Sequence, residues 1–267
     1  MKLEGTQKEA LIRLACFFEQ RGIPFAVIGA LAPVLMIDSQ RKEEDGYGCR
    51  ITKDVDVSIR ANGWREYEAL KADLILSGFS EKPGFPEHCL FYDGVQVDLI
   101  PCGDALIRNG ILEWPRSGFR MNVRGFERIF QNTQTVQIEE GISVPVIPVP
   151  LSIFLKIITW LDRHESRDLE DILYMLDQYE TVEVSERRFE TPDSEALNYD
   201  NRGAFLAGSD LKKLGIEGLA EIVKPFFEAF IDEDTPILFS VSRRVAKGTI
   251  EMVRLIQTFK LGLGISE

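Results

Sequence analysis

The sequence has few of the residues that build histidine- or cysteine-based metal sites. Its only two histidines are His88 and His164, so a histidine-centred metal site or catalytic triad is not expected. The four cysteines have no C-x-x-C spacing, which gives no zinc signal and fits the reducing cytoplasm. No apolar run approaches the roughly 20 residues that cross a bilayer, and residues 1–20 are too acidic for a signal peptide. We therefore expect a cytoplasmic protein with no membrane partner.

Net positive charge is also missing, since the chain carries −12 at pH 7. The excess is local: residues 165–234 hold 19 acidic and 7 basic side chains, and the other residues hold 24 of each. A strongly acidic chain repels nucleotides and nucleic acid, which are also negatively charged. The residues outside 165–234 are neutral as a group, so this argument does not apply to them. The acidic segment predicts a solvated helical surface, with an interface for a basic partner as the alternative.

The pattern of apolar residues changes near residue 150. Before it, residues 23–29, 54–59, 88–101 and 135–149 have strand or hairpin character, between helical stretches at 6–22 and 64–78. After it, apolar residues recur at helical spacing. This predicts an α/β (α+β) fold, with a mixed β-sheet core flanked by helices over residues 1–149 and a mainly helical domain over residues 150–267.

Two aspartates interrupt an otherwise good strand at residues 54–59. Asp54 and Asp56 share one face with Ser58, while apolar residues occupy the other. Two like charges about 7 Å apart on one strand gain nothing from each other unless a cation lies between them. A lone D-x-D of this kind is better explained by a solvated edge of an antiparallel sheet, so other residues have to decide.

A third aspartate lies on a similar strand, in VQVDLIP at residues 95–101. If this strand lies beside the first, Asp98 converges with Asp54 and Asp56 on one face. Carboxylates are preferred ligands of Mg²⁺, and two such ions about 3.5–4 Å apart clamp an in-line displacement at phosphorus. Asp54 and Asp56 would bind both ions, and Asp98 would complete the site and draw the proton from an acceptor hydroxyl.

Residues that could bind phosphate accompany the aspartates. The strand at residues 23–29 ends at Gly29, and Ala30 opens an apolar helical turn, so backbone N–H groups are offered to a triphosphate. Arg50 and Thr52 share the parity of Asp54 and Asp56. A guanidinium can pair with phosphate oxygens, and a threonine hydroxyl can bond the backbone or a substrate.

With these residues in place, the sequence resembles the nucleotidyltransferase superfamily, whose motifs are G-S or G-G followed by D-x-D. The form R-x-T-x-D-x-D at residues 50–56 is most similar to the AbiEii/AbiGii-type enzymes, toxins of type IV toxin–antitoxin systems. That group has two further motifs, K-x-x-A-x-x-x-R and D-x-x-D. They match Lys156 and Arg163, with Thr159 in the alanine position, and then Asp168 and Asp171.

The resemblance implies transfer of a nucleoside monophosphate from a nucleoside triphosphate to an acceptor hydroxyl, with release of pyrophosphate. It implies two Mg²⁺ ions, for which Mn²⁺ can substitute. Lys156 and Arg163 would bind the triphosphate, and Asp168 and Asp171 would hold those cations or orient the nucleoside; a surface salt-bridge set is the alternative. Ala30 departs from the usual Ser or Gly, which removes a hydroxyl contact and leaves the backbone contacts.

The acceptor is open at this point. The resemblance implies the 3′ end of tRNA and a cognate antitoxin protein as partners. A small molecule such as an antibiotic is the alternative acceptor. A third hypothesis is that the protein is not an enzyme and keeps the fold only as a binding module. No residue of the sequence separates the two acceptors. Because the departures from the family pattern remove no metal ligand, we expect an active enzyme.

Overall fold

The part of the chain that the structure describes forms two compact units. The structure is a computed structural model, and it describes residues 3, 5–37, 52–183, 187, 191–192, 197–198 and 200–265. The first unit contains the residues up to Leu35 and those from Thr52 to Pro148. The second contains the remaining described residues.

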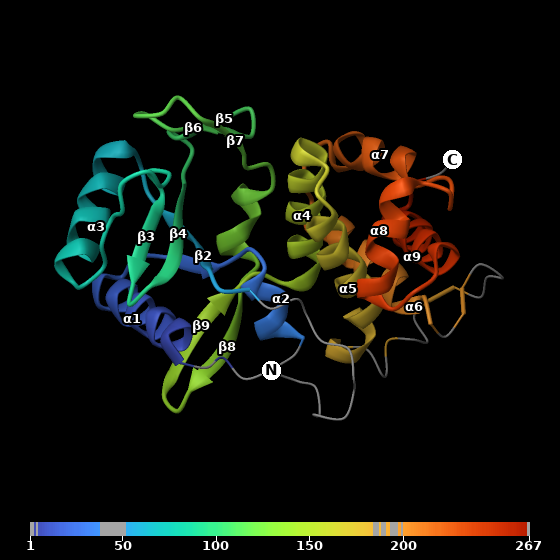
Figure 1. Cartoon of the computed structure of the whole chain (residues 1–267), viewed down its shortest axis with the longest axis horizontal. Coiled ribbons are helices and arrows are strands. Elements are labelled where there is room, and N and C mark those ends of the chain that lie inside the picture. The colour runs from blue at the N-terminus through green and yellow to red at the C-terminus, as the bar shows by residue number, and fades with distance from the viewer. Residues whose placement is uncertain are drawn as a thin grey trace. The chain divides into compact units, whose positions relative to one another are not determined.

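A six-stranded mixed sheet is the centre of the first unit (Figure 1). Across the sheet the strands are β3 (Cys89–Tyr92), β4 (Val95–Cys102), β2 (Val55–Arg60), β1 (Phe25–Val27), β9 (Ile142–Val146) and β8 (Gln134–Glu139). The β2–β4 and β1–β9 pairs are parallel and the other pairs are antiparallel. This arrangement confirms the predicted mixed sheet.

Helices α1 (Gly5–Arg21) and α3 (Trp64–Leu76) flank this sheet (Figure 1). The apolar side of α1 is buried, and α1 packs along β2, β4 and β9. From α3, the Tyr67 hydroxyl donates a hydrogen bond of 3.0 Å to the carbonyl of Leu99 on β4. Burial raises the pKa of Tyr67 far above its usual range, because the ionised phenol would lose its hydration. The helices therefore fix the strand that carries Asp98.

Strand β2 is covered more completely than its alternating pattern predicts. Its apolar residues Val55, Val57 and Ile59 are fully buried, as expected. Ser58 is also fully buried, however, so the face that it shares with Asp56 is not open along its whole length. A strand paired on both sides inside a mixed sheet is usually covered on both faces; in β2 Asp56 stays half-buried, and Arg60 at the other end is exposed.

Shorter elements complete the first unit. A second, three-stranded sheet contains β5 (Ile107–Arg108), β6 (Ile111–Glu113) and β7 (Arg120–Asn122), and the 3₁₀ helix η2 (Phe126–Gln131) follows it. Helix α2 (Leu31–Met36) has only six residues and comes directly after Gly29 and Ala30. A helix this short has little macrodipole, so backbone geometry near Gly29 matters more than helix charge.

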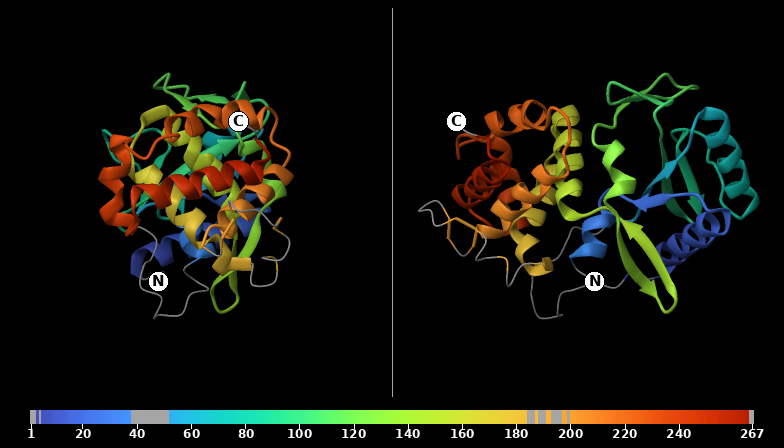
Figure 2. Two further views of the ribbon diagram at one scale, coloured as in Figure 1. Left: turned by 90° about the vertical axis from the view of Figure 1, so that its right-hand side faces the viewer. Right: turned by 180° about the vertical axis from the view of Figure 1, so that it is seen from behind.

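The second unit consists of helices, as predicted after residue 150 (Figure 2). They are α4 (Val149–Arg163), α5 (Ser166–Glu183), α6 (Arg202–Lys213), α7 (Leu219–Ala229), α8 (Pro236–Val245) and α9 (Thr249–Leu263). Helices α6 and α9 approach most closely through Gly208 and Gly262, because a Cβ at Gly208 would lie 2.2 Å from the Phe259 carbonyl oxygen. Within the described residues, no helix is both long and apolar enough to cross a membrane.

Candidate active site

The carboxylates predicted to converge lie on neighbouring strands. Strands β2 and β4 are parallel partners, and Asp56 stands directly opposite Asp98 in their register. Asp54 precedes β2 by one residue, and all three aspartates are half-buried. Paired residues of one sheet project to the same face, so Asp56 and Asp98 share it. The expectation that the two strands are adjacent is therefore confirmed.

The chain just before β2 is held in place by side-chain hydrogen bonds. The Gln7 amide of α1 donates to the backbone carbonyls of Asp54 at 3.0 Å and Thr52 at 3.3 Å. Thr52 is buried, and its hydroxyl donates a short hydrogen bond to Asp54 Oδ1. These contacts fix Asp54 relative to Asp56 although Asp54 lies outside the strand. The sequence indicated that the Thr52 hydroxyl would bond the backbone or a substrate, whereas its acceptor here is the Asp54 side chain.

Gly29 lies against the side chain of Asp56. Its φ of +65° is in the left-handed region, and a Cβ added there would lie 1.9 Å from Asp56 Oδ2. Backbone and carboxylate can therefore lie this close only because the residue has no side chain. The amide of Ile28 donates to the Asp56 carbonyl at 2.9 Å, which ties the two segments together. Ala30, the next residue, is buried.

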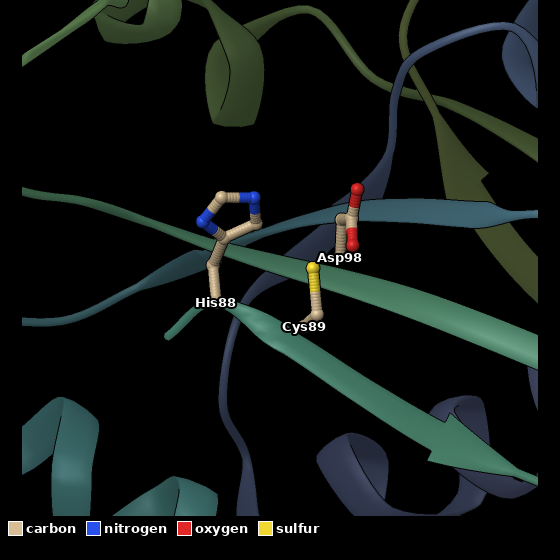
Figure 3. A group of neighbouring side chains, drawn as sticks. All are labelled: His88, Cys89 and Asp98. Atoms are coloured by element: carbon tan, nitrogen blue, oxygen red, sulfur yellow. The ribbon is translucent and has the colours of Figure 1, made fainter. Parts of the chain in front are cut away.

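Asp98 is surrounded by polar groups that the sequence did not assign to the site. Gln96 Nε2 donates to Asp98 Oδ1 at 2.9 Å and lies 3.7 Å from Cys89 Sγ. Cys89 is the register partner of Asp98 on β3, and His88 precedes it (Figure 3). Ligand atoms of His88, Cys89 and Asp98 all lie within 4.8 Å of one another.

The pKa values of His88 and Cys89 are shifted by this environment. Burial raises the pKa of the Cys89 thiol, and its hydrogen bond to Asp98 and the charge of Asp56 act in the same direction. Burial lowers the pKa of His88 against the opposing charges of Asp98 and Glu87. At neutral pH this favours a neutral imidazole and a protonated thiol beside the aspartates.

A pattern in the sequence could have placed Cys89 opposite Asp98. Asp93 and Gly94 both have positive φ, at 44° and 84°, as a two-residue hairpin turn requires. A turn at that position pairs 92 with 95 and, counting back, 89 with 98, which is the observed register. His88 is harder to predict, because adjacent strand residues normally face opposite ways and His88 lies just before β3.

The four residues of the helical motifs form one ion-pair network in the second unit. Arg163 Nε lies 2.6 Å from Asp168 Oδ2, and its terminal NH₂ lies 2.7 Å from Asp168 Oδ1. Lys156 Nζ lies 2.7 Å from Asp171 Oδ2 and 3.4 Å from Asp168 Oδ1. The expected proximity of two cations on α4 and two acids on α5 is therefore observed.

This network is buried on its acidic side. Asp168 is fully buried and Asp171 is 2% exposed, whereas the Arg163 side chain is 38% exposed. The hydrogen bonds that Arg163 donates to the Asp168 carboxylate raise the pKa of Arg163, so the guanidinium keeps its charge. Thr159, in the alanine position of the motif, donates to the Leu155 carbonyl at 2.8 Å and thereby satisfies its hydroxyl within the helix.

Two of the sequence expectations lie outside the described residues. Arg50 and the polar segment 39–49 both fall in the range 38–51. The other predicted residues divide between the units: Gly29, Ala30, Thr52 and the three aspartates belong to the first, and the ion-pair network belongs to the second.

No protein-family model and no curated protein sequence matches this chain. Among solved structures, it resembles an antigenic nucleotidyltransferase-like protein from Paracoccidioides brasiliensis, at 18% identity and a TM-score of 0.44, over 84% of this chain and 95% of that one. It also resembles ANT(2″)-Ia in complex with adenylyl-2″-tobramycin, at 15% identity and a TM-score of 0.36, over 84% and 99%. A third is the cyclic dinucleotide synthase CdnE of Elizabethkingia meningoseptica, at 13% identity and a TM-score of 0.26, over 97% and 90%. Likeness at this level carries no inference about function, which has to come from the residues.

Proposed function

We propose that the chain is a divalent-metal-dependent nucleotidyltransferase. Residues 1–149 form its catalytic core, and residues 150–267 form a helical domain that supplies further nucleotide-binding side chains. The observation that carries the proposal is the direct pairing of Asp56 with Asp98 on parallel strands, with the Gly29 backbone against Asp56. The order of motifs along the sequence adds independent support.

The residues fit a hard divalent cation. Asp54, Asp56 and Asp98 offer carboxylate oxygens from one region of the sheet, which is the ligand type that Mg²⁺ and Mn²⁺ prefer. Thr52 and Gln96 hydrogen-bond to two of these carboxylates and orient them, as polar neighbours of metal ligands usually do. When bound, the metal ions offset the charge of the triphosphate and of the displaced pyrophosphate.

The protein's own groups then position the substrates and move one proton. The acceptor oxygen attacks the α-phosphorus, the bond to the bridging oxygen breaks, and pyrophosphate leaves with the bonding electrons. Asp98 accepts the proton of the acceptor hydroxyl, and Gln96 holds the other side of that carboxylate. The backbone near Gly29 and Ala30, together with Arg50, binds phosphate oxygens.

The ion-pair network of the helical unit serves the triphosphate in this proposal. Lys156 and Arg163 supply positive charge, and Arg163 is the more exposed of the two. Asp168 and Asp171 fix the direction of these side chains, since each acid lies within ion-pair distance of Lys156. Both acids are buried, which favours contact with the cations over direct orientation of the nucleoside.

The resemblance to the AbiEii/AbiGii group supports the 3′ end of tRNA as the acceptor, in a cytoplasmic toxin that a cognate antitoxin neutralises. Adenylylation of a small molecule such as an antibiotic uses the same core with a different acceptor. A non-catalytic module would keep the fold and lose the transfer. One experiment can separate the three.

In this experiment the protein is incubated with Mg²⁺, each α-³²P-labelled nucleoside triphosphate in turn, and total RNA or an aminoglycoside mixture. Label in a tRNA-sized gel band supports the tRNA acceptor, and a labelled small product on thin-layer chromatography supports the alternative. Isothermal titration with each nucleotide and Mg²⁺ tests the non-catalytic reading. Absence of both transfer and binding at millimolar nucleotide would contradict the proposed function.

A further inference from the structure

A second group of metal-ligand side chains adjoins the aspartates: His88, Cys89 and Asp98 (Figure 3). His88 is 8% exposed and Cys89 is 2% exposed, so both are held by their surroundings. The register of β3 and β4 places Cys89 opposite Asp98, and the Leu99 amide donates to the His88 carbonyl at 3.0 Å. The backbone of all three ligands is therefore fixed by strand pairing.

The ligand atoms are close enough for one ion. All of them lie within 4.8 Å of one another, and the three side chains point to the same side of the two strands (Figure 3). In a tetrahedral zinc site with bonds of about 2.0–2.3 Å, ligand atoms lie about 3.4–3.6 Å apart. Small rotations about the side-chain bonds, within the present rotamers, would bring the ligand atoms to these separations without movement of the strands.

The donor set differs from that of the aspartates. One nitrogen, one sulfur and one oxygen suit a borderline ion such as Zn²⁺ or Co²⁺, whereas Mg²⁺ avoids thiolate. Gln96 contacts both Cys89 and Asp98 and would orient them.

His88 is held by its neighbours. The Trp114 ring packs on the His88 ring, with the ring centroids 5.0 Å apart, and limits its rotation. The nearby Lys71 ammonium is paired with Glu81 at 2.5 Å, which offsets its charge.

We propose that His88, Cys89 and Asp98 bind one transition-metal ion of the zinc class, and that this ion competes with the catalytic cations for Asp98. Binding releases the thiol proton of Cys89 to solvent and leaves a fourth ligand position for water. The site itself rests only on the geometry of these residues. The inhibitory consequence rests on the proposed function, because it requires Asp98 to take part in nucleotidyl transfer.

Cobalt binding tests the site directly. The metal-free full-length protein is titrated with Co²⁺, and the near-ultraviolet band from thiolate to cobalt charge transfer is recorded. We expect a band that saturates at one equivalent and disappears in Cys89→Ser, with affinity lowered about tenfold or more in His88→Asn. Cys16→Ser is the matched control, because Cys16 lies in the same unit on α1, and it should keep the band. Circular dichroism checks that each variant is folded.

The outcomes separate the two proposals. A band that survives Cys89→Ser, or no band at all, overturns the metal site whatever the enzyme does. If nucleotidyl transfer is found, the ratio of activity with and without Zn²⁺ is measured for each variant against itself. That ratio should be well below one in wild type and in Cys16→Ser, because Zn²⁺ inhibits both, and near one in Cys89→Ser. Zinc inhibition of equal depth in all three overturns the competition for Asp98.

Discussion

The backbone of Gly29 lies so close to Asp56 that an added Cβ would fall 1.9 Å from the carboxylate oxygen Oδ2. The three heavy atoms nearest to that Cβ all belong to the Asp56 side chain, so a substitution there acts on the carboxylate before anything else. Gly29 also has a φ of +65°, which costs a residue with a side chain about 1 kcal/mol. The two effects can be separated experimentally.

Gly29→Ala is expected to displace Asp56 and weaken Mn²⁺ binding about tenfold or more, as loss of a metal ligand's position usually does. Isothermal titration of Mn²⁺ measures the effect without knowledge of the acceptor. Gly22→Ala is the control, because Gly22 has nearly the same φ of +63° and nothing within 4 Å of its added Cβ. It should lose similar stability and keep Mn²⁺ affinity; equal affinity in both variants would contradict a role for Gly29.

Asp56→Asn should lower nucleotide transfer about 100-fold or more, since it removes a charged metal ligand while keeping the shape of the side chain. Thermal stability should stay unchanged or rise, because one of several nearby like charges is removed. Label transfer from α-³²P nucleotides and thermal unfolding measure the two effects. The exposed Asp104→Asn controls for the loss of one negative charge. Normal transfer by Asp56→Asn would show that the metal site is placed wrongly.

The sharing of one face by Asp56 and Asp98 was predictable only on condition that their strands are neighbours, because each sequence alternates apolar and polar residues around its aspartate. That the strands are neighbours, and that Asp56 stands directly opposite Asp98, comes from the sheet pairing, which neither segment shows by itself. The ion-pair network was predictable from helical spacing, since Lys156 and Arg163 lie seven residues apart on one helix. Full burial of Ser58 was not, because the pattern of one strand does not show what covers it. The position of His88 beside Asp98 depends on the residue just before β3, where strand periodicity no longer applies.

Asp168→Asn should lower the free energy of unfolding by about 2–4 kcal/mol, because it removes a buried acceptor for Arg163 and Lys156 and leaves their charges less compensated. Urea unfolding of the full chain measures this. Glu165→Gln is the control, since Glu165 also pairs with Arg163 but is 42% exposed, and its effect should stay within about 0.5 kcal/mol. Equal effects of the two substitutions would contradict a buried network.

Asp210 on α6 should make the stability of the helical unit pH-dependent. Burial alone would raise its pKa, but hydrogen bonds from Arg187, Lys213 and Tyr179 outweigh this and lower the pKa to about 2. The carboxylate of the unfolded chain titrates near 3.8, so its stabilisation is complete above that pH and is lost as the pH falls towards 2.

The expected contribution of Asp210 is about 1–2 kcal/mol, since its side chain is mostly buried. Unfolding measured from pH 5 to pH 2 should show a smaller loss of stability in Asp210→Asn than in wild type. Asp200→Asn, at an exposed position, controls for the change in net charge. Parallel pH profiles for wild type and Asp210→Asn would contradict the lowered pKa.

The close approach of α6 and α9 depends on the absence of a side chain at Gly208. Within an ordinary helix, replacing glycine by alanine stabilises by up to about 1 kcal/mol. Here the added methyl group would lie 2.2 Å from the Phe259 carbonyl oxygen and 2.9 Å from the Leu263 amide nitrogen, both of which are backbone atoms that cannot rotate away. The two helices must therefore separate, and Gly208→Ala should destabilise by about 1–3 kcal/mol.

Ser209→Ala is the matched control for Gly208→Ala, because it changes the next residue of the same helix at a half-buried position. It should be neutral or stabilising by a few tenths of a kcal/mol, as helix propensity predicts. Thermal and urea unfolding of both variants give the comparison. The sign of the change in unfolding free energy is the test. A stabilising Gly208→Ala would mean that the helices do not meet at this glycine. Destabilisation by Gly208→Ala but not by Ser209→Ala would support the contact between α6 and α9.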